Sequence, residues 1–124
     1  MYDQFVPKFV EGYKTKLRIG DPLQTGVNVG PVHHERSVKL FRDTVAFYKE
    51  QGSKMLVGGS VIDGNFVQPT VFEAPADKGV NYDAIKTEYF TPVVHVVKFS
   101  GDVQEVVDAV NSTGYGLSCG VFTT

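Results

Sequence analysis

Two side chains in residues 86–99 (KTEYFTPVVHVVKF) are of types that suit ligand binding. Glu88 and Phe90 come just before a run of valines, where a buried strand is expected to begin. A carboxylate can accept hydrogen bonds from both hydroxyls of a vicinal diol, and an aromatic ring can cover the apolar face of a sugar or base. The pair therefore suits a ribose. A solvated glutamate in a loop is the alternative interpretation of Glu88.

The elements around this pair strengthen the functional interpretation. Residues 82–88 are expected to form about two helical turns, and residues 92–100 form the most clearly predicted strand. Glu88 would then lie at the negative end of a helix dipole, an arrangement that costs roughly a few tenths of a kcal/mol. Stability alone would favour a lysine at this position.

Two longer helices are predicted before this region. The first has an apolar face over residues 2–17, and because Pro7 lacks an N–H, the helix is expected to begin close to Pro7 or to be kinked there. Residues 19–31 are rich in glycine and proline and form a surface connection. The second helix is predicted at residues 35–51, with Gly52 as its left-handed cap. Its inward-facing residues are Val38, Phe41, Val45 and Tyr48.

Short apolar runs predict the strands. They lie at residues 54–57, which end at the Gly58-Gly59 turn, and at residues 66–74, an edge or bulged strand because Pro69 cannot donate to a ladder. A turn at residues 63–65 and a loop at 75–81 flank the second run. A third helix is expected after a capping box at Asp102, and residues 117–123 (LSCGVFT) are predicted to form a last strand. This alternation predicts an α/β fold with a largely parallel sheet.

Composition excludes several classes of protein. The 124 residues suit one domain with a modest core, and a net charge of −2 gives no electrostatic footprint for nucleic acid. No apolar run reaches the roughly 20 residues that span a membrane. A single cysteine, Cys119, fits a reducing compartment such as the cytoplasm. We therefore expect a soluble intracellular domain.

The other reactive residue types favour structural roles. His33 and His34 precede a helix and His95 lies within a predicted strand, without the paired cysteines or carboxylates of a metal site. Cys119 falls in a predicted strand and is expected to be a buried structural thiol. The glycines at residues 26–30 follow a proline-containing loop and match no phosphate-binding pattern. No catalytic and no metal-binding residue is predicted.

Several ordered segments resemble the NAD(P)-dependent aldehyde dehydrogenase superfamily. EYFTP at residues 88–92 resembles its E-x-F-G-P motif, and NSTGYGLSCGVFT at residues 111–123 resembles N-x-x-x-Y-G-L-x-x-x-V-F-T. YDQFVPKFVEG, IGDPL, VGP, GGS and NFVQPTVFEA also occur in the family's order. The resemblance covers essentially the whole chain, and IGDPL and GPVHH lean towards the antiquitin-like (aminoadipate-semialdehyde dehydrogenase) branch. Thr91 in place of glycine and the Pro7 within a helix depart from the pattern.

The resemblance implies a role for the opening pair. Glu88 would bind the ribose hydroxyls on the nicotinamide side of NAD or NADP, and Phe90 would pack beside that ribose and the nicotinamide ring. The chain would be part of the catalytic domain of an enzyme that oxidises an aldehyde to a carboxylic acid. The catalytic cysteine, the general base and the nucleotide-binding domain would lie in preceding segments, so residues 1–124 alone are expected to be inactive and to bind cofactor weakly or not at all.

Two interpretations of the chain as a whole remain open. It is either a fragment of such an enzyme or a non-enzymatic module with a structural or assembly role. In both cases, an apolar sheet with unpaired edges predicts a homo-oligomer, with contacts near residues 117–122.

Overall fold

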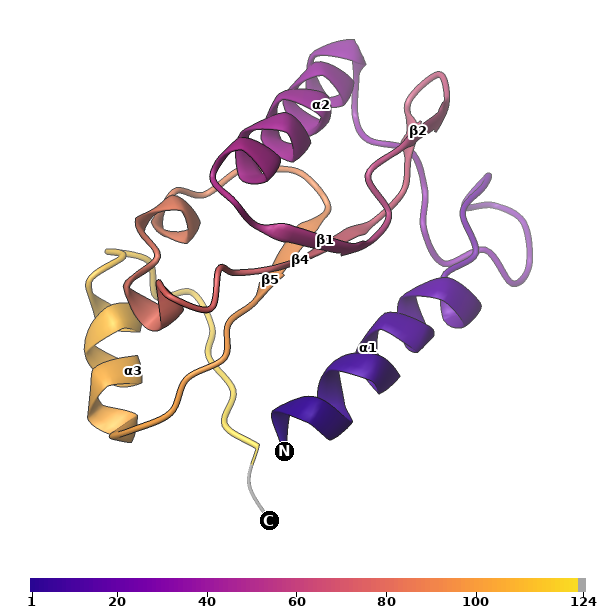
Figure 1. The fold of residues 1–124 in the computed structure, drawn as a ribbon. Helices are drawn as coiled ribbons and strands as arrows, with labels where there is room; N and C mark the ends of the chain where they lie inside the picture. The colour runs from indigo at the N-terminus through magenta and orange to yellow at the C-terminus, as the bar shows by residue number, and fades with distance from the viewer. Residues whose placement is uncertain (123–124) are drawn as a thin grey trace.

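The computed structural model describes residues 1–122 as a mixed α/β unit. Its helices are α1 (Tyr2–Lys16), α2 (Glu35–Glu50), α3 (Val103–Asn111) and the 3₁₀ turns η1 (Gly79–Asn81) and η2 (Asp83–Lys86). Its strands are β1 (Lys54–Val57), β2 (Val61–Asp63), β3 (Phe66–Val67), β4 (Thr70–Glu73) and β5 (Val93–Val96). Figure 1 shows α2 above the three-stranded sheet, α1 below it, and α3 beside the two 3₁₀ turns.

The main sheet has the order β1-β4-β5 and is mixed, so the expectation of a largely parallel sheet is wrong. β1 and β4 are antiparallel, because the chain returns between them through the small β2–β3 hairpin with no crossover helix. β4 and β5 are parallel, with Phe72 opposite His95, because residues 74–92 make the longer crossover through η1 and η2. Helices and strands therefore do not alternate regularly along the chain.

The core lies between α2 and the sheet, as the period of α2 predicts. Val38, Phe41, Val45 and Tyr48 are all buried, and they pack with Val67 and Phe72. Burying each large side chain contributes roughly 1.5–3 kcal/mol. The helix ends at Glu50, and Gly52 follows as the predicted left-handed cap, with a φ of 85°. Its N–H bonds Lys49 O, and the Ser53 N–H bonds Tyr48 O.

β4 is the central strand of the sheet, so of the two alternatives predicted for residues 66–74, an edge strand or a bulged strand, the edge strand is wrong. The pairing of β4 with β1 does have a register shift, between Met55 and Val57 of β1. Pro69 lies just before the strand, in the break between β3 and β4, and the ladder starts one residue later. There the Thr70 N–H donates to Pro92 O at 2.9 Å. The backbone at Gly58 packs closely against Pro69, and only glycine fits there, since a Cβ at Gly58 would lie 2.5 Å from the carbonyl oxygen of Pro69.

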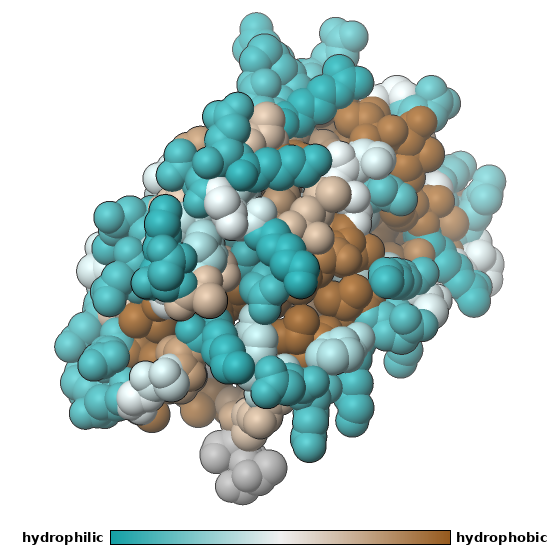
Figure 2. Space-filling view, in the orientation of Figure 1, coloured by the Kyte–Doolittle hydropathy of each residue, from teal (hydrophilic) through white to brown (hydrophobic). Residues whose placement is uncertain are grey.

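α1 begins at Tyr2, so the first of the two predicted alternatives, a start close to Pro7, is wrong, and a kink at Pro7 stays a prediction. The helix tolerates the proline because only one backbone bond is lost, the one to the carbonyl of Asp3, and Asp3 is exposed to water. Tyr2 Oη donates to Glu73 Oε1 at 2.6 Å and holds the start of the helix to the end of β4. Figure 2 shows apolar side chains gathered between the sheet and α1.

The last third of the chain has less regular structure than predicted. β5 ends at Val96, four residues before the predicted end at residue 100, and α3 follows with Asp102 as its N-cap, whose carboxylate accepts from Gln104 N–H. Residues 117–122 form no strand, and the end of the predicted strand at Thr123 lies outside the described residues. None of the helices in the described part is long and apolar enough to cross a membrane.

Candidate functional site

The candidate site is the segment between η2 and β5, in which exposed and packed side chains follow one another. Tyr89 packs inward, with its ring centroid 5.9 Å from that of Phe47 and 5.8 Å from that of Tyr48. Glu88 is exposed, and Phe90 is 84% exposed. Glu88 and Phe90 are therefore both open to water, while Tyr89 between them anchors the segment to α2.

Two tight backbone turns set the course of this segment. Thr91 N–H donates to Tyr89 O and Val93 N–H donates to Thr91 O, each at 2.7 Å, which are the i to i+2 bonds of γ-turns. Within residues 1–122, no residue other than glycine has a positive φ. The backbone at Thr91 therefore does not require the glycine that the family motif has at this position.

Glu88 does not end a helix, so the predicted conflict with a helix dipole is wrong. η2 ends at Lys86, and Thr87 is already extended, with φ −95° and ψ 128°. Tyr82, where the helix was expected to begin, lies just before η2 and is buried. Its hydroxyl lies 2.8 Å from Ser53 Oγ and so anchors this part of the chain. The Ile85 N–H donates to Tyr82 O at 3.2 Å, so a short 3₁₀ turn stands where about two helical turns were predicted.

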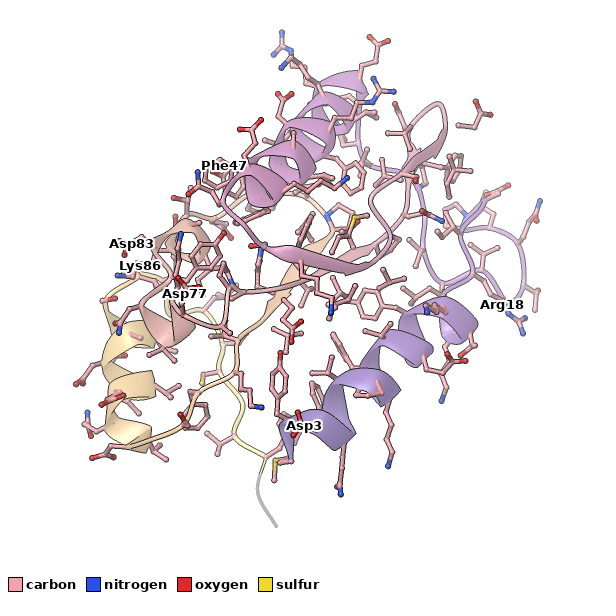
Figure 3. The ribbon with its side chains drawn as sticks, in the orientation of Figure 1. Asp3, Arg18, Phe47, Asp77, Asp83 and Lys86 are labelled. Carbon is pink, nitrogen blue, oxygen red and sulfur yellow. The ribbon has the colours of Figure 1, made fainter. Side chains whose placement is uncertain are left out.

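The charged groups of η2 pair with each other (Figure 3). Lys86 Nζ lies 2.7 Å from Asp83 Oδ1, and the hydrogen bond and charge of Lys86 lower the pKa of the Asp83 carboxyl. The Lys86 ammonium is therefore already paired with a carboxylate on its own 3₁₀ turn.

His95 packs on aromatic residues of the core, in agreement with the structural role that the sequence favours. Its ring centroid lies 4.0 Å from that of Tyr48, and it stacks on Phe72 at 5.8 Å. Burial lowers the pKa of His95 to about 4, so the imidazole is neutral at pH 7.

The other residues considered from the sequence, the histidines before α2 and the single cysteine, do not form a site. The His34 ring accepts at Nδ1 from Ser37 N–H at 3.1 Å and so caps α2. Cys119 is exposed on a segment without strand structure, so the expectation of a buried thiol is wrong. Among residues 1–122, no three His, Cys, Asp or Glu side chains gather in a way that could hold a metal ion.

Sequence reasoning missed the part that Tyr89 plays. The prediction singled out Glu88 and Phe90 but assigned no role to the aromatic residue between them. Three aromatic residues, Phe47, Tyr48 and Tyr89, form the support for the segment. The sequence did hold a signal for this role: Phe47 and Tyr48 are adjacent near the end of α2, and such a pair can pack against an aromatic residue from another segment.

The fold and the site together define a mixed α/β unit that presents a carboxylate and an aromatic ring beside a strand. The Aldehyde dehydrogenase family profile matches residues 1–124. A protein of Malus domestica named aldehyde dehydrogenase family 7 member A1 is 42% identical over 126 residues, which cover 100% of this chain and 24% of that protein. The chain therefore belongs to the aldehyde dehydrogenase family, and this relative supports the antiquitin-like branch that the sequence indicated.

Solved structures agree with this assignment. A mutant aldehyde dehydrogenase from Bacillus cereus gives a TM-score of 0.85 at 28% identity, over 98% of this chain and 24% of that one. A benzaldehyde dehydrogenase from Corynebacterium glutamicum, described as NAD-dependent, gives 0.77 at 30% identity, over 93% and 24%. The chain thus spans about a quarter of the length of the proteins it matches.

Proposed function

We propose that this chain is part of the catalytic domain of an enzyme that oxidises an aldehyde to a carboxylic acid with NAD or NADP. In this proposal Glu88 accepts hydrogen bonds from the hydroxyls of the nicotinamide-side ribose, and Phe90 packs beside that ribose and the ring. The observation that carries the proposal is the exposure of both Glu88 and Phe90 on one short segment that Tyr89 holds on α2.

The residues fit the group they would hold. A carboxylate with free lone pairs suits a vicinal diol, and an exposed ring offers a face for an apolar surface. The bound dinucleotide supplies the hydride acceptor, and this chain's residues bind and orient it. The nucleophilic cysteine and the general base are proposed to come from other parts of the complete enzyme, so this chain alone is proposed to be inactive.

An assembly role is the second candidate, and an exposed apolar surface favours it. Leu117, Val121 and Phe122 are exposed, as are Val103, Val107 and Val110 of α3. Exposed apolar side chains are common at interaction surfaces, so we propose that the chain forms a homo-oligomer through residues 117–122. The single cysteine, which is free, supports a reducing compartment such as the cytoplasm.

The test of the cofactor proposal is Glu88→Gln in the complete enzyme. The amide keeps the shape but loses the charge and part of the accepting capacity, so the KM for NAD(P) should rise or hydride transfer should slow, with little change in melting temperature. Glu105→Gln is the matched control, an exposed glutamate on α3. Unchanged cofactor kinetics in Glu88→Gln would contradict the proposal, and so would equal effects of both changes.

A further inference from the structure

One buried side chain of α2, Tyr48, contacts the chain before, within and after the site segment, which is residues 87–92 between η2 and β5. Before the segment, the Tyr48 hydroxyl donates to Ala84 O of η2 at 3.1 Å. Within it, the ring centroids of Tyr48 and Tyr89 are 5.8 Å apart. After it, the Tyr48 ring centroid lies 4.0 Å from that of His95 on β5. A single residue therefore joins α2 to the middle of this segment and to the elements at both of its ends.

The core holds Tyr48 itself in place. The residue is only 3% exposed, and its ring also packs on Phe72 of β4, with 5.7 Å between the ring centroids. Protein interiors are close-packed, so a buried ring in such contacts has little freedom to move. Burial raises the pKa of Tyr48 to about 12, so the hydroxyl keeps its proton and remains a hydrogen-bond donor at pH 7. Tyr48 thus combines a fixed position with a directional contact.

The position of η2 depends on contacts with other elements, because its own polar contacts are local. Lys86 pairs with Asp83 within the turn, and the Ile85 N–H donates to Tyr82 O beside it. Ile85 also packs against the core, but apolar packing sets no direction. The hydrogen bond from Tyr48 joins η2 to α2 with a preferred geometry. We expect this bond to fix where η2, and the site segment that follows it, lie against α2.

We propose that Tyr48 is a positioning residue, which sets where the side chains of Glu88 and Phe90 lie. It acts through its hydrogen bond to Ala84 O and its ring contact with Tyr89. Since the Glu88 and Phe90 side chains are exposed, packing restrains them little, and their positions depend on how the backbone is held. The effect on cofactor binding rests on the proposed function, whereas the restraint on the site segment does not.

Hydrogen exchange in the complete enzyme without cofactor tests the restraint. Tyr48→Phe removes the hydroxyl and keeps the ring, so peptides spanning residues 83–92 should exchange roughly two- to tenfold faster, the range expected from the loss of one hydrogen bond. Tyr2→Phe is the matched control, because it removes a hydroxyl bond to Glu73 Oε1 at the far end of β4, and it should leave these peptides unchanged. Unchanged exchange at residues 83–92 in Tyr48→Phe would overturn the proposal. An equal rise in peptides spanning β4, or in Tyr2→Phe, would show a general loss of stability and would also overturn it.

Cofactor kinetics test the consequence for the site. Tyr48→Phe should raise the KM for NAD(P) or slow hydride transfer, and its effect should combine with that of Glu88→Gln to less than the product of the two, because Tyr48 acts in part through Glu88. Fully multiplicative effects would contradict this coupling. If Glu88→Gln alone leaves cofactor kinetics unchanged, the proposed function fails, and the exchange measurement still decides whether Tyr48 restrains the segment.

Discussion

β4 and residues 117–122 are both short apolar segments, and both were predicted to be strands, yet only β4 is one. β4 lies between β1 and β5, and its Phe72 is fully buried. Residues 117–122 have no strand partner among residues 1–122, and Phe122 is 93% exposed. The comparison teaches that an apolar segment makes a strand only when a neighbouring strand supplies hydrogen-bond partners, because backbone groups need partners to leave water.

The largest effect expected from this contrast is on stability. Phe72→Ala should destabilise the chain by about 3–5 kcal/mol, because it removes a fully buried ring and leaves a cavity between α2 and the sheet. Phe122→Ala should change the free energy of unfolding by less than about 0.5 kcal/mol, because the ring is already in water. Urea denaturation of both variants measures the free energy of unfolding, and similar losses of stability in the two variants would contradict the contrast.

The next effect concerns association. If residues 117–122 are an interaction surface, Leu117→Asp with Val121→Asp should lower the mass of the oligomer, because it puts two charges on the contact. Leu23→Asp is the matched control, an equally exposed apolar residue in the connection between α1 and α2. Sedimentation over a concentration series gives the mass. A monodisperse monomer at high micromolar concentration of the unaltered chain would refute association.

A further predicted effect is the dependence of stability on pH. The pKa of His95 is about 4 in the folded chain against 6.5 for an unperturbed histidine, so the unfolded chain takes up the proton first. The stability that depends on the neutral imidazole is fully present above pH 6.5 and falls as the pH is lowered from about 6.5 towards about 4. Urea midpoints across this range should show the decline.

Two variants separate His95 from other titrating groups. His95→Phe should remove this part of the pH dependence, and His33→Gln, at an exposed histidine, should retain it. An unchanged slope in His95→Phe would show that the buried imidazole does not titrate in this way.

The sequence predicted the elements that depend on local pattern. The apolar period of α2, its glycine cap and the Asp102 cap of α3 are all confirmed, because propensity and capping act within a few residues. The predicted strand directions and the predicted place of β4 at the edge of the sheet were wrong, since both depend on how the chain returns between strands. Pro69 illustrates this, because it lies just outside the most buried strand.

The candidate site was predicted in part. Glu88 and Phe90 were selected for their chemistry, and the structure leaves both exposed on one segment. The helix-dipole argument for Glu88 was wrong, because a four-residue 3₁₀ turn replaced the expected helix. That Tyr89 would pack on Phe47 and Tyr48 could not be predicted from sequence, because α2 and the site segment are far apart in the chain.

The central claim is that Phe90 contacts the nicotinamide side of the cofactor, and ¹⁹F NMR of the complete enzyme tests it most directly. 4-Fluorophenylalanine placed at Phe90 reports on the ring, and the same label at Phe5 of α1 is the control. The resonance at Phe90 should move as NAD(P) is added and saturate together with cofactor binding, while that at Phe5 stays in place. A Phe90 resonance that is unmoved at saturating cofactor would contradict the account.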